Sequence, residues 1–169
     1  KSLKKSLAYY GGKPIRKKEM PSRKAISKEE INYINYVLDY YNKLDEDPPY
    51  DGHFQKVFEN NFSKKMNGGF STAVCSGSVA CFVGLRAMRL PTKSEVLISP
   101  VTDSGSLFAI IECGLKPVII DSMKDTYNTS WDQISKGINK NTSALFLVHC
   151  SGNPLEMKRI SKESKKLGI

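Results

Sequence analysis

The feature that most constrains the fold is the alternation of three short apolar runs with helix-length segments in the second half of the chain. The runs are Glu95–Ser99, Pro117–Asp121 and Ser143–Val148. Consecutive apolar residues, many of them β-branched, are typical of strands that are buried on both faces of a parallel sheet. Segments with apolar residues at helical spacing lie between the runs and after the last one. This order predicts an α/β fold of three layers, a mostly parallel sheet with helices on both faces.

A further strand-like run, Gly69–Cys75, comes before the other three and ends in the turn Ser76-Gly77-Ser78, after which a helix is expected. The first turn of a helix leaves backbone N–H groups unpaired and carries the positive end of the helix dipole. Gly77 would let an anion approach these groups, and Ser78 would add a hydroxyl donor, so the turn is a candidate phosphate site. Ser and Gly also serve simply to turn and cap such connections, and the residues alone leave both interpretations open.

Two helices are expected before the first strand. Ser27-Lys28-Glu29-Glu30 has the pattern of a capping box, and apolar residues follow at helical spacing. The apolar positions are Ile31, Ile34, Val37, Leu38 and Tyr41 in the first helix, and Phe54, Val57, Phe58, Phe62 and Met66 in the second. We interpret these side chains as core or interface residues rather than cofactor ligands. If that face is buried, Phe58→Ala should cost about 3–5 kcal/mol of stability.

The net charge of +9 resides entirely in residues 1–28, which hold ten Lys or Arg and one acid, Glu19. We therefore divide the chain into a basic amino-terminal arm, 1–28, and a neutral domain, 29–169. A basic arm can bind the phosphates of nucleic acids. Only Tyr9 and Tyr10 could stack on bases, so a solvated arm is the favoured interpretation and nucleic acid is not an expected partner.

Several classes of protein are disfavoured by composition. No run approaches the roughly 20 apolar residues that a membrane span needs, so a cytoplasmic protein without membrane contact is expected. The four cysteines, at positions 75, 81, 113 and 150, form no CxxC pair and are interpreted as buried free thiols. With two histidines, His53 and His149, no metal site is expected, and His149 is interpreted as a structural histidine bonded to backbone.

The order of segments resembles the amino-terminal half of the DegT/DnrJ/EryC1/StrS family of sugar aminotransferases. Gly11–Arg16 is similar to the family's GGxP(V/I)R, and Val74–Ala80 resembles its SGT-A phosphate turn. The other stretches that carry the resemblance are Glu95–Pro100, Gly114–Asp121, Asp125–Asn128 and Val148–Pro154. The likeness runs nearly from end to end in the family's order, so it is more specific than the phosphate turn alone.

The resemblance implies a cofactor, pyridoxal 5′-phosphate (PLP), and part of the large domain of the PLP-dependent transferases. The cofactor phosphate would be held by Gly77 and Ser78. The reaction implied is transfer of an amino group from an amino-acid donor, usually glutamate, to the keto group of a nucleotide-linked sugar, as in polysaccharide or antibiotic sugar biosynthesis. PLP would serve as the electron sink. The family also implies a homodimer.

The chain departs from the family in two places. Where the family has a Thr-aromatic pair whose ring stacks on the cofactor, this chain has Val101–Ser106. Asp103 falls there and is expected either at the cofactor or as the cap of the next helix. The family's pyridine-binding Asp and its cofactor-linked lysine come further on, so no catalytic residue is assigned here and truncation after Ile169 is expected. A non-catalytic protein that binds a phosphorylated ligand, or a PLP-dependent sugar dehydratase, remains as an alternative.

Overall fold

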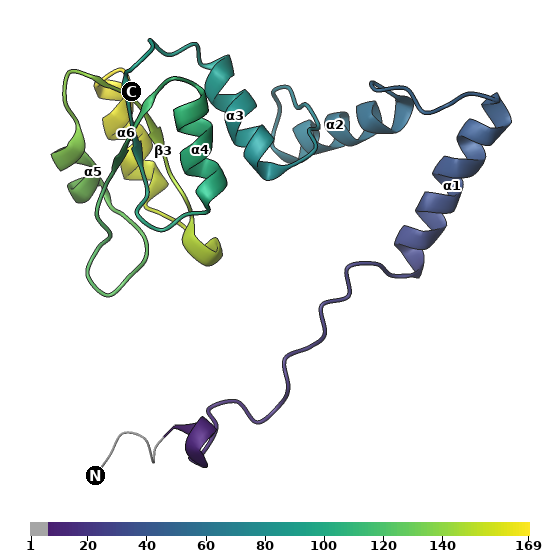
Figure 1. Ribbon diagram of the computed structural model, residues 1–169, viewed down its shortest axis with the longest axis horizontal. Helices are drawn as coiled ribbons and strands as arrows, with labels where there is room; N and C mark the ends of the chain where they lie inside the picture. Colours follow the sequence, from purple (N-terminus) through teal and green to yellow (C-terminus); the bar gives the residue numbers. More distant parts are fainter. Residues whose placement is uncertain (1–6) are drawn as a thin grey trace. The chain divides into compact units, whose positions relative to one another are not determined.

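The computed structural model describes residues 7–169 (Figure 1). The described chain forms two compact units, an amino-terminal unit that ends at Val57 and a sheet unit, Phe58–Ile169. The helices are η2 (Ala8–Tyr10), α1 (Lys28–Leu44), α2 (His53–Lys65), α3 (Gly77–Ala87), α4 (Ser104–Glu112), α5 (Trp131–Gly137), η3 (Cys150–Gly152) and α6 (Met157–Lys166), and the strands are β1 (Glu95–Ile98), β2 (Lys116–Ile119) and β3 (Thr142–Phe146). None of the described helices is both long enough and apolar enough to cross a membrane.

The sheet unit is built on three parallel strands in the order β2-β1-β3. Ile98 at the end of β1 is in register with Ile119 of β2 on one side and with Phe146 of β3 on the other. The central strand is buried along its whole length. All three apolar runs that predicted this sheet thus form strands, and the expected parallel α/β fold is confirmed.

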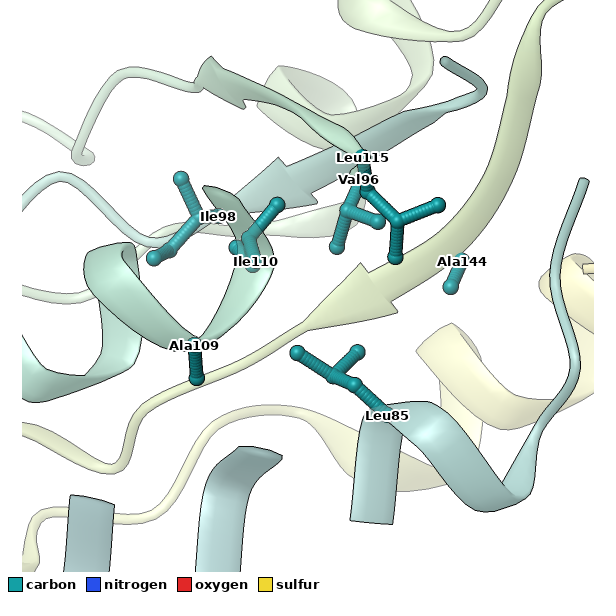
Figure 2. Packing of buried hydrophobic residues seen from close by; sticks show 7 residues of the cluster. All are labelled: Leu85, Val96, Ile98, Ala109, Ile110, Leu115 and Ala144. Carbon is teal, nitrogen blue, oxygen red and sulfur yellow. The ribbon is translucent and has the colours of Figure 1, made fainter. Parts of the chain in front are cut away.

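Helices cover both faces of this sheet because successive residues of β1 point to opposite sides. On one face, Val96 and Ile98 pack with side chains of α3 and α4, and the cluster comprises Leu85, Val96, Ile98, Ala109, Ile110, Leu115 and Ala144 (Figure 2). On the other face, Leu97 packs with Ile134 of α5 and Ile160 of α6. Burying each large aliphatic side chain contributes on the order of 1.5–3 kcal/mol. The three-layer architecture is confirmed.

The strand predicted at Gly69–Cys75 is wrong, since this segment has no regular secondary structure. A strand needs a hydrogen-bonded neighbour. Among the described residues, none of the three strands of the sheet pairs with this segment. Gly68 and Gly69 adopt positive φ angles of 115° and 83°, and Phe70 is fully exposed. The run therefore forms an irregular connection that leads into α3 at the expected place.

Both helices predicted before the sheet are present as α1 and α2, and the predicted capping box closes the start of α1. Ser27 Oγ accepts a hydrogen bond from the N–H of Glu29, and the Glu30 carboxylate accepts one from the N–H of Ser27. The hydrogen bond from the Ser27 side chain is the main cause that lowers the pKa of Glu30. The first six residues of the predicted basic arm lie outside the described residues, and its boundary at residue 28 stays a prediction.

Most of the apolar residues of α1 and α2, interpreted from the sequence as core or interface residues, do not lie in a core, and their role at an interface stays a prediction. Only Tyr41 is buried in α1, and no residue of α2 is buried. Ile31 and Ile34 are each 51% exposed and Phe58 is 58% exposed. Ring contacts within the amino-terminal unit replace a core there, with Phe54 edge-on to Tyr40 at 5.1 Å between ring centroids. The four cysteines are free thiols as expected, but Cys75 is exposed and the other three are only half-buried.

Candidate functional site

The connections that leave two neighbouring strands diverge at the carboxyl end of the sheet. The chain leaves β1 into α4, whose Ala109 and Ile110 pack on one face of the sheet. It leaves the adjacent β3 into α6, whose Ile160 packs on the opposite face. In open α/β sheets, ligands bind at such a point of divergence, outside the carboxyl ends of the strands. We call the space beyond the ends of β1 and β3 the switch crevice.

The start of α3 leaves backbone N–H groups open to a ligand. Ser76 is the N-cap residue, and its Oγ accepts a hydrogen bond from the N–H of Val79 at 3.2 Å. In the part of the chain that the structure describes, no acceptor takes a hydrogen bond from the N–H of Gly77 or Ser78. A Cβ atom placed on Gly77 would meet no other atom within 4 Å. The turn therefore offers two unused donors and open space beside them.

Asp103 is the N-cap residue of α4. Its Oδ1 accepts a hydrogen bond from the N–H of Gly105 at 2.8 Å, which confirms the interpretation of Asp103 as a helix cap. A Cβ atom on Gly105 would collide with the side chain of Ser78 and would lie 3.0 Å from Asp103 Oδ1. The missing side chain at Gly105 thus lets the starts of α3 and α4 lie against one another. Because α4 begins just after β1 ends, this contact puts the phosphate turn at the carboxyl edge of the sheet.

The three site residues predicted from sequence, Gly77, Ser78 and Asp103, are consequently brought together at one edge. Their roles toward a cofactor stay predictions. A carboxylate repels a phosphate at short range, so Asp103 suits a position beside the anion-binding donors better than a direct contact with the anion. The helix dipoles of α3 and α4 both present their positive ends at this edge.

The loop that follows β3 forms another part of the switch crevice. The N–H of Val148 donates to Ser99 Oγ at 3.0 Å, so this loop starts against the end of β1. His149 Nδ1 accepts a hydrogen bond from the N–H of Leu155 at 3.1 Å, which confirms the structural interpretation of this histidine. Sequence reasoning missed Asn128, whose side-chain amide bonds this loop twice. In the sequence, the segment Asp125–Asn128 contributes only to the family resemblance and predicts no such role.

A polar cleft of about 520 Å³ lies between the starts of α5 and α6. Arg159 spans it, with one guanidinium nitrogen 2.6 Å from Asp132 and the other 3.6 Å from Glu156. Glu156 also accepts a hydrogen bond from the N–H of Trp131 at 2.9 Å. Arg159 thus pairs with both carboxylates, and its bond to Asp132 joins α6 to α5. We assign none of these three charged side chains to a site.

The sequence model described as the DegT/DnrJ/EryC1/StrS aminotransferase family matches residues 25–169. The chain is 31% identical over 145 residues to the GDP-perosamine synthase of Escherichia coli O157:H7, which covers 86% of this chain and 38% of that enzyme. Its fold resembles that of NtdA from Bacillus subtilis with bound cofactor PMP, with a TM-score of 0.76 at 23% identity over 85% of this chain and 33% of that one. It also resembles a GDP-4-keto-6-deoxymannose-3-dehydratase, with a TM-score of 0.73 at 23% identity over 83% of this chain and 36% of that one.

The matches cover most of this chain but a minor part of each relative. The chain spans 38% of the length of the perosamine synthase and 33% of the length of the NtdA chain. The match to the family model begins before α1 and continues through α6. It therefore includes the phosphate turn, the switch crevice and both helices that precede them.

Proposed function

Because the chain belongs to the DegT/DnrJ/EryC1/StrS aminotransferase family, we propose that it forms the amino-terminal part of a PLP-dependent aminotransferase that acts on a nucleotide-linked keto sugar. The observation that carries the proposal is the pair of unused N–H donors at Gly77 and Ser78, beside the switch crevice. The amino donor in this proposal is an amino acid, glutamate above all, and the enzyme works in the cytoplasm.

The residues at the start of α3 fit the phosphate of PLP. Two backbone N–H groups and the Ser78 hydroxyl supply three donors to one anion, and charge-assisted hydrogen bonds of this kind are stronger than neutral ones. Gly77 leaves the N–H donors open to an approaching phosphate, because it has no side chain and no other atom lies within 4 Å of the place where its Cβ would be. The α3 dipole adds a favourable interaction of about 0.3–1 kcal/mol with a negative charge.

The residues of this chain have a binding and orienting role in the proposed reaction. When bound, PLP supplies an electron sink for bond changes at the carbon that carries the amino group. Gly77 and Ser78 anchor its phosphate, while Asp103 and Ser99 hold the ends of α4 and β1 at the rim of the crevice. No lysine of the described residues is assigned to the chemistry.

The homodimer is part of the same proposal, and an apolar groove beside the phosphate turn supports it. The groove has a volume of about 310 Å³, and Ser78, Phe82 and Phe108 are among its lining residues. Phe108 is 59% exposed. A second copy that covered these rings would bury apolar surface immediately next to the cofactor phosphate, which is where a shared active site would lie.

The test is a titration with pyridoxamine 5′-phosphate (PMP), which has no aldehyde and cannot react with surface lysines. We expect Gly77→Leu to weaken PMP binding by about tenfold or more. The leucine side chain would cover the N–H donors, and PMP would then lose at least one charge-assisted hydrogen bond. Gly77→Ala is the matched control, since its Cβ meets no atom. Equal affinity of Gly77→Leu and the unchanged chain would remove Gly77 and Ser78 from the site.

A dehydratase would use the same phosphate site, so binding measurements do not separate it from an aminotransferase. Dehydration is the second candidate function, because the fold resembles that of the 3-dehydratase about as well as that of NtdA. The TM-scores are 0.73 and 0.76. Product analysis with a nucleotide-linked keto sugar and glutamate separates the two. An amino sugar with consumption of glutamate nitrogen supports amino transfer, and a deoxy sugar without nitrogen supports dehydration.

A further inference from the structure

Asn128 holds a turn of the loop after β3 through both ends of its side-chain amide. It lies between β2 and α5 and is 3% exposed. Its Nδ2 donates to the carbonyl oxygen of Asn153 at 2.9 Å, and its Oδ1 accepts from the N–H of Cys150 at 3.1 Å. The turn Cys150–Asn153 is therefore bonded at its first and last residues to one side chain, 22 and 25 positions earlier in the sequence.

The backbone between these two hydrogen bonds is in a conformation that needs support. Ser151 has φ 53° and ψ 29°, in the left-handed region that residues with a side chain rarely adopt. Gly152 follows with φ 77°. Such conformations persist where the surrounding structure fixes them, and they concentrate at functional sites. Asn128 is the side chain that bonds both ends of this turn.

The fixed turn belongs to the loop that flanks the switch crevice. The loop begins at Val148, whose N–H is bonded to Ser99 at the end of β1. The phosphate turn lies at the same edge of the sheet, where Ser78 meets Gly105 at the start of α4. A ligand whose phosphate is anchored at Gly77 and Ser78, and which extends across the ends of the strands, meets the loop after β3.

We propose that Asn128 is a positioning residue for the ligand site: it holds the turn Cys150–Asn153 as one wall of the switch crevice. The proposal deepens the proposed function and rests on it for the identity of the ligand, PLP or its amino form PMP. The need for an amide is specific, because only Asn supplies one donor and one acceptor at this length. Asp keeps the acceptor but loses the donor, Leu keeps the volume but loses both, and Gln is one methylene too long.

The first arm of the test measures amide hydrogen exchange by NMR in the unchanged chain, Asn128→Asp and Asn128→Leu. We expect the amides of Cys150–Asn153 to exchange about tenfold faster in Asn128→Leu, and less so in Asn128→Asp, because each lost hydrogen bond frees part of the turn. The amides of β1 should keep their protection, which also shows that the variants are folded. Ile134→Val is the control, since it removes a methyl group from the buried face of α5 and touches none of these hydrogen bonds.

The second arm measures affinity for two probes, PMP and inorganic phosphate. Phosphate occupies only the phosphate turn, so its affinity should be the same in the Asn128 variants and the unchanged chain. PMP also reaches across the crevice, and its affinity should fall by about tenfold in Asn128→Leu, the change expected for one lost buried hydrogen bond. Ile134→Val should alter neither affinity.

The outcomes separate the two proposals. If the unchanged chain binds neither probe at Gly77 and Ser78, the proposed function fails, while the exchange arm still decides whether Asn128 holds the turn. If PMP binds but Asn128→Leu alters neither its affinity nor exchange in the turn, the positioning role is overturned. If both probes weaken equally, Asn128 acts on the fold as a whole, and the positioning role is again overturned.

Discussion

Apolar patterns predict both β1 of the sheet unit and α1 of the amino-terminal unit, but the burial of these two elements is opposite. Along β1, Val96, Leu97 and Ile98 are at most 1% exposed. Along α1, Ile31 and Ile34 are each 51% exposed. The apolar residues are consecutive in β1 and at helical spacing in α1, and both segments form the predicted element. They differ in whether a covering surface lies within the same unit.

An apolar pattern therefore identifies which face of an element is apolar, but it does not identify the surface that covers this face. A parallel strand comes with its own cover, because the crossover helices that connect it to its neighbours return over the sheet. A helix that is not part of such a crossover comes with no cover of its own. In the amino-terminal unit, α1 buries only Tyr41, while rings such as Tyr40 and Phe54 contact one another but are only half-buried.

The largest effect should come from one chemical change made in both regions. Leu97→Ala, at a fully buried position, should lower the free energy of unfolding by about 2–5 kcal/mol because it leaves a cavity. Leu38→Ala, in α1 at a residue that is 57% exposed, should change it by less than about 0.5 kcal/mol. Urea unfolding of both variants provides the measurement. Equal losses would show that the two regions are packed alike.

A smaller effect is expected at the cap of α4. Asp103→Ala removes the acceptor of the Gly105 N–H and should cost about 1 kcal/mol, while Asp103→Asn keeps an acceptor and should cost a few tenths at most. Thermal unfolding measures both. If Asp103→Asn proves as costly as Asp103→Ala, the negative charge rather than the cap is what stabilises this edge of the sheet.

A pH effect should distinguish a carboxyl group of the sheet from one of α1. The side chain of Glu95 is 10% exposed, and two hydrogen bonds lower the pKa of its carboxyl group. The larger effect comes from Asn139 at 2.7 Å, and the next from Lys116 at 2.9 Å. A lowered folded-state pKa gives stability that is present above the unfolded pKa of about 4.3 and lost as pH falls through the folded value.

Stability measured between pH 6 and 3 should therefore fall less steeply in Glu95→Gln than in the unchanged chain below about pH 4.3. Glu30, whose pKa is also lowered, belongs to an exposed capping box, and Glu30→Gln should change the pH profile less. Parallel profiles for Glu95→Gln and the unchanged chain would contradict the role of this carboxylate at the amino end of the sheet.

The smallest effect is expected at Phe58. From the sequence, Phe58→Ala is predicted to cost about 3–5 kcal/mol if that face of the helix is buried. The side chain is 58% exposed and contacts Phe62 with ring centroids 6.0 Å apart, so we expect a change within about 0.5 kcal/mol. Denaturant unfolding at a concentration where the chain is monomeric measures it. A loss above about 2 kcal/mol would restore the buried face that the sequence predicted.

Much of the fold could be predicted because its signals are local. The β-branched runs, the capping box at Ser27 and the turn at Gly77 each act within a few residues, and each forms the expected structure. The run Gly69–Cys75 shows the limit of this reasoning. Its residues suit a strand, but a strand also needs a hydrogen-bonded neighbour, and strand pairing is a property of the whole sheet.

The candidate site could be predicted only in part, because it also depends on contacts between residues far apart in the sequence. Gly77, Ser78 and Asp103 were identified from a turn and from family resemblance, and the contact between Ser78 and Gly105 brings them to one edge. The switch crevice depends on the strand order β2-β1-β3, which no local pattern encodes. Asn128 depends on hydrogen bonds to residues more than twenty positions away.

The central claim is that the start of α3 binds the phosphate of a PLP-type cofactor, and backbone amide NMR during a titration with PMP tests it most directly. We predict that the largest and saturable shifts occur at the N–H signals of Gly77 and Ser78, and that in Gly77→Leu the shifts at this turn need at least about tenfold more PMP to reach half of their full size. Shifts confined to other residues, or no saturable shift at these two amides, would contradict the claim.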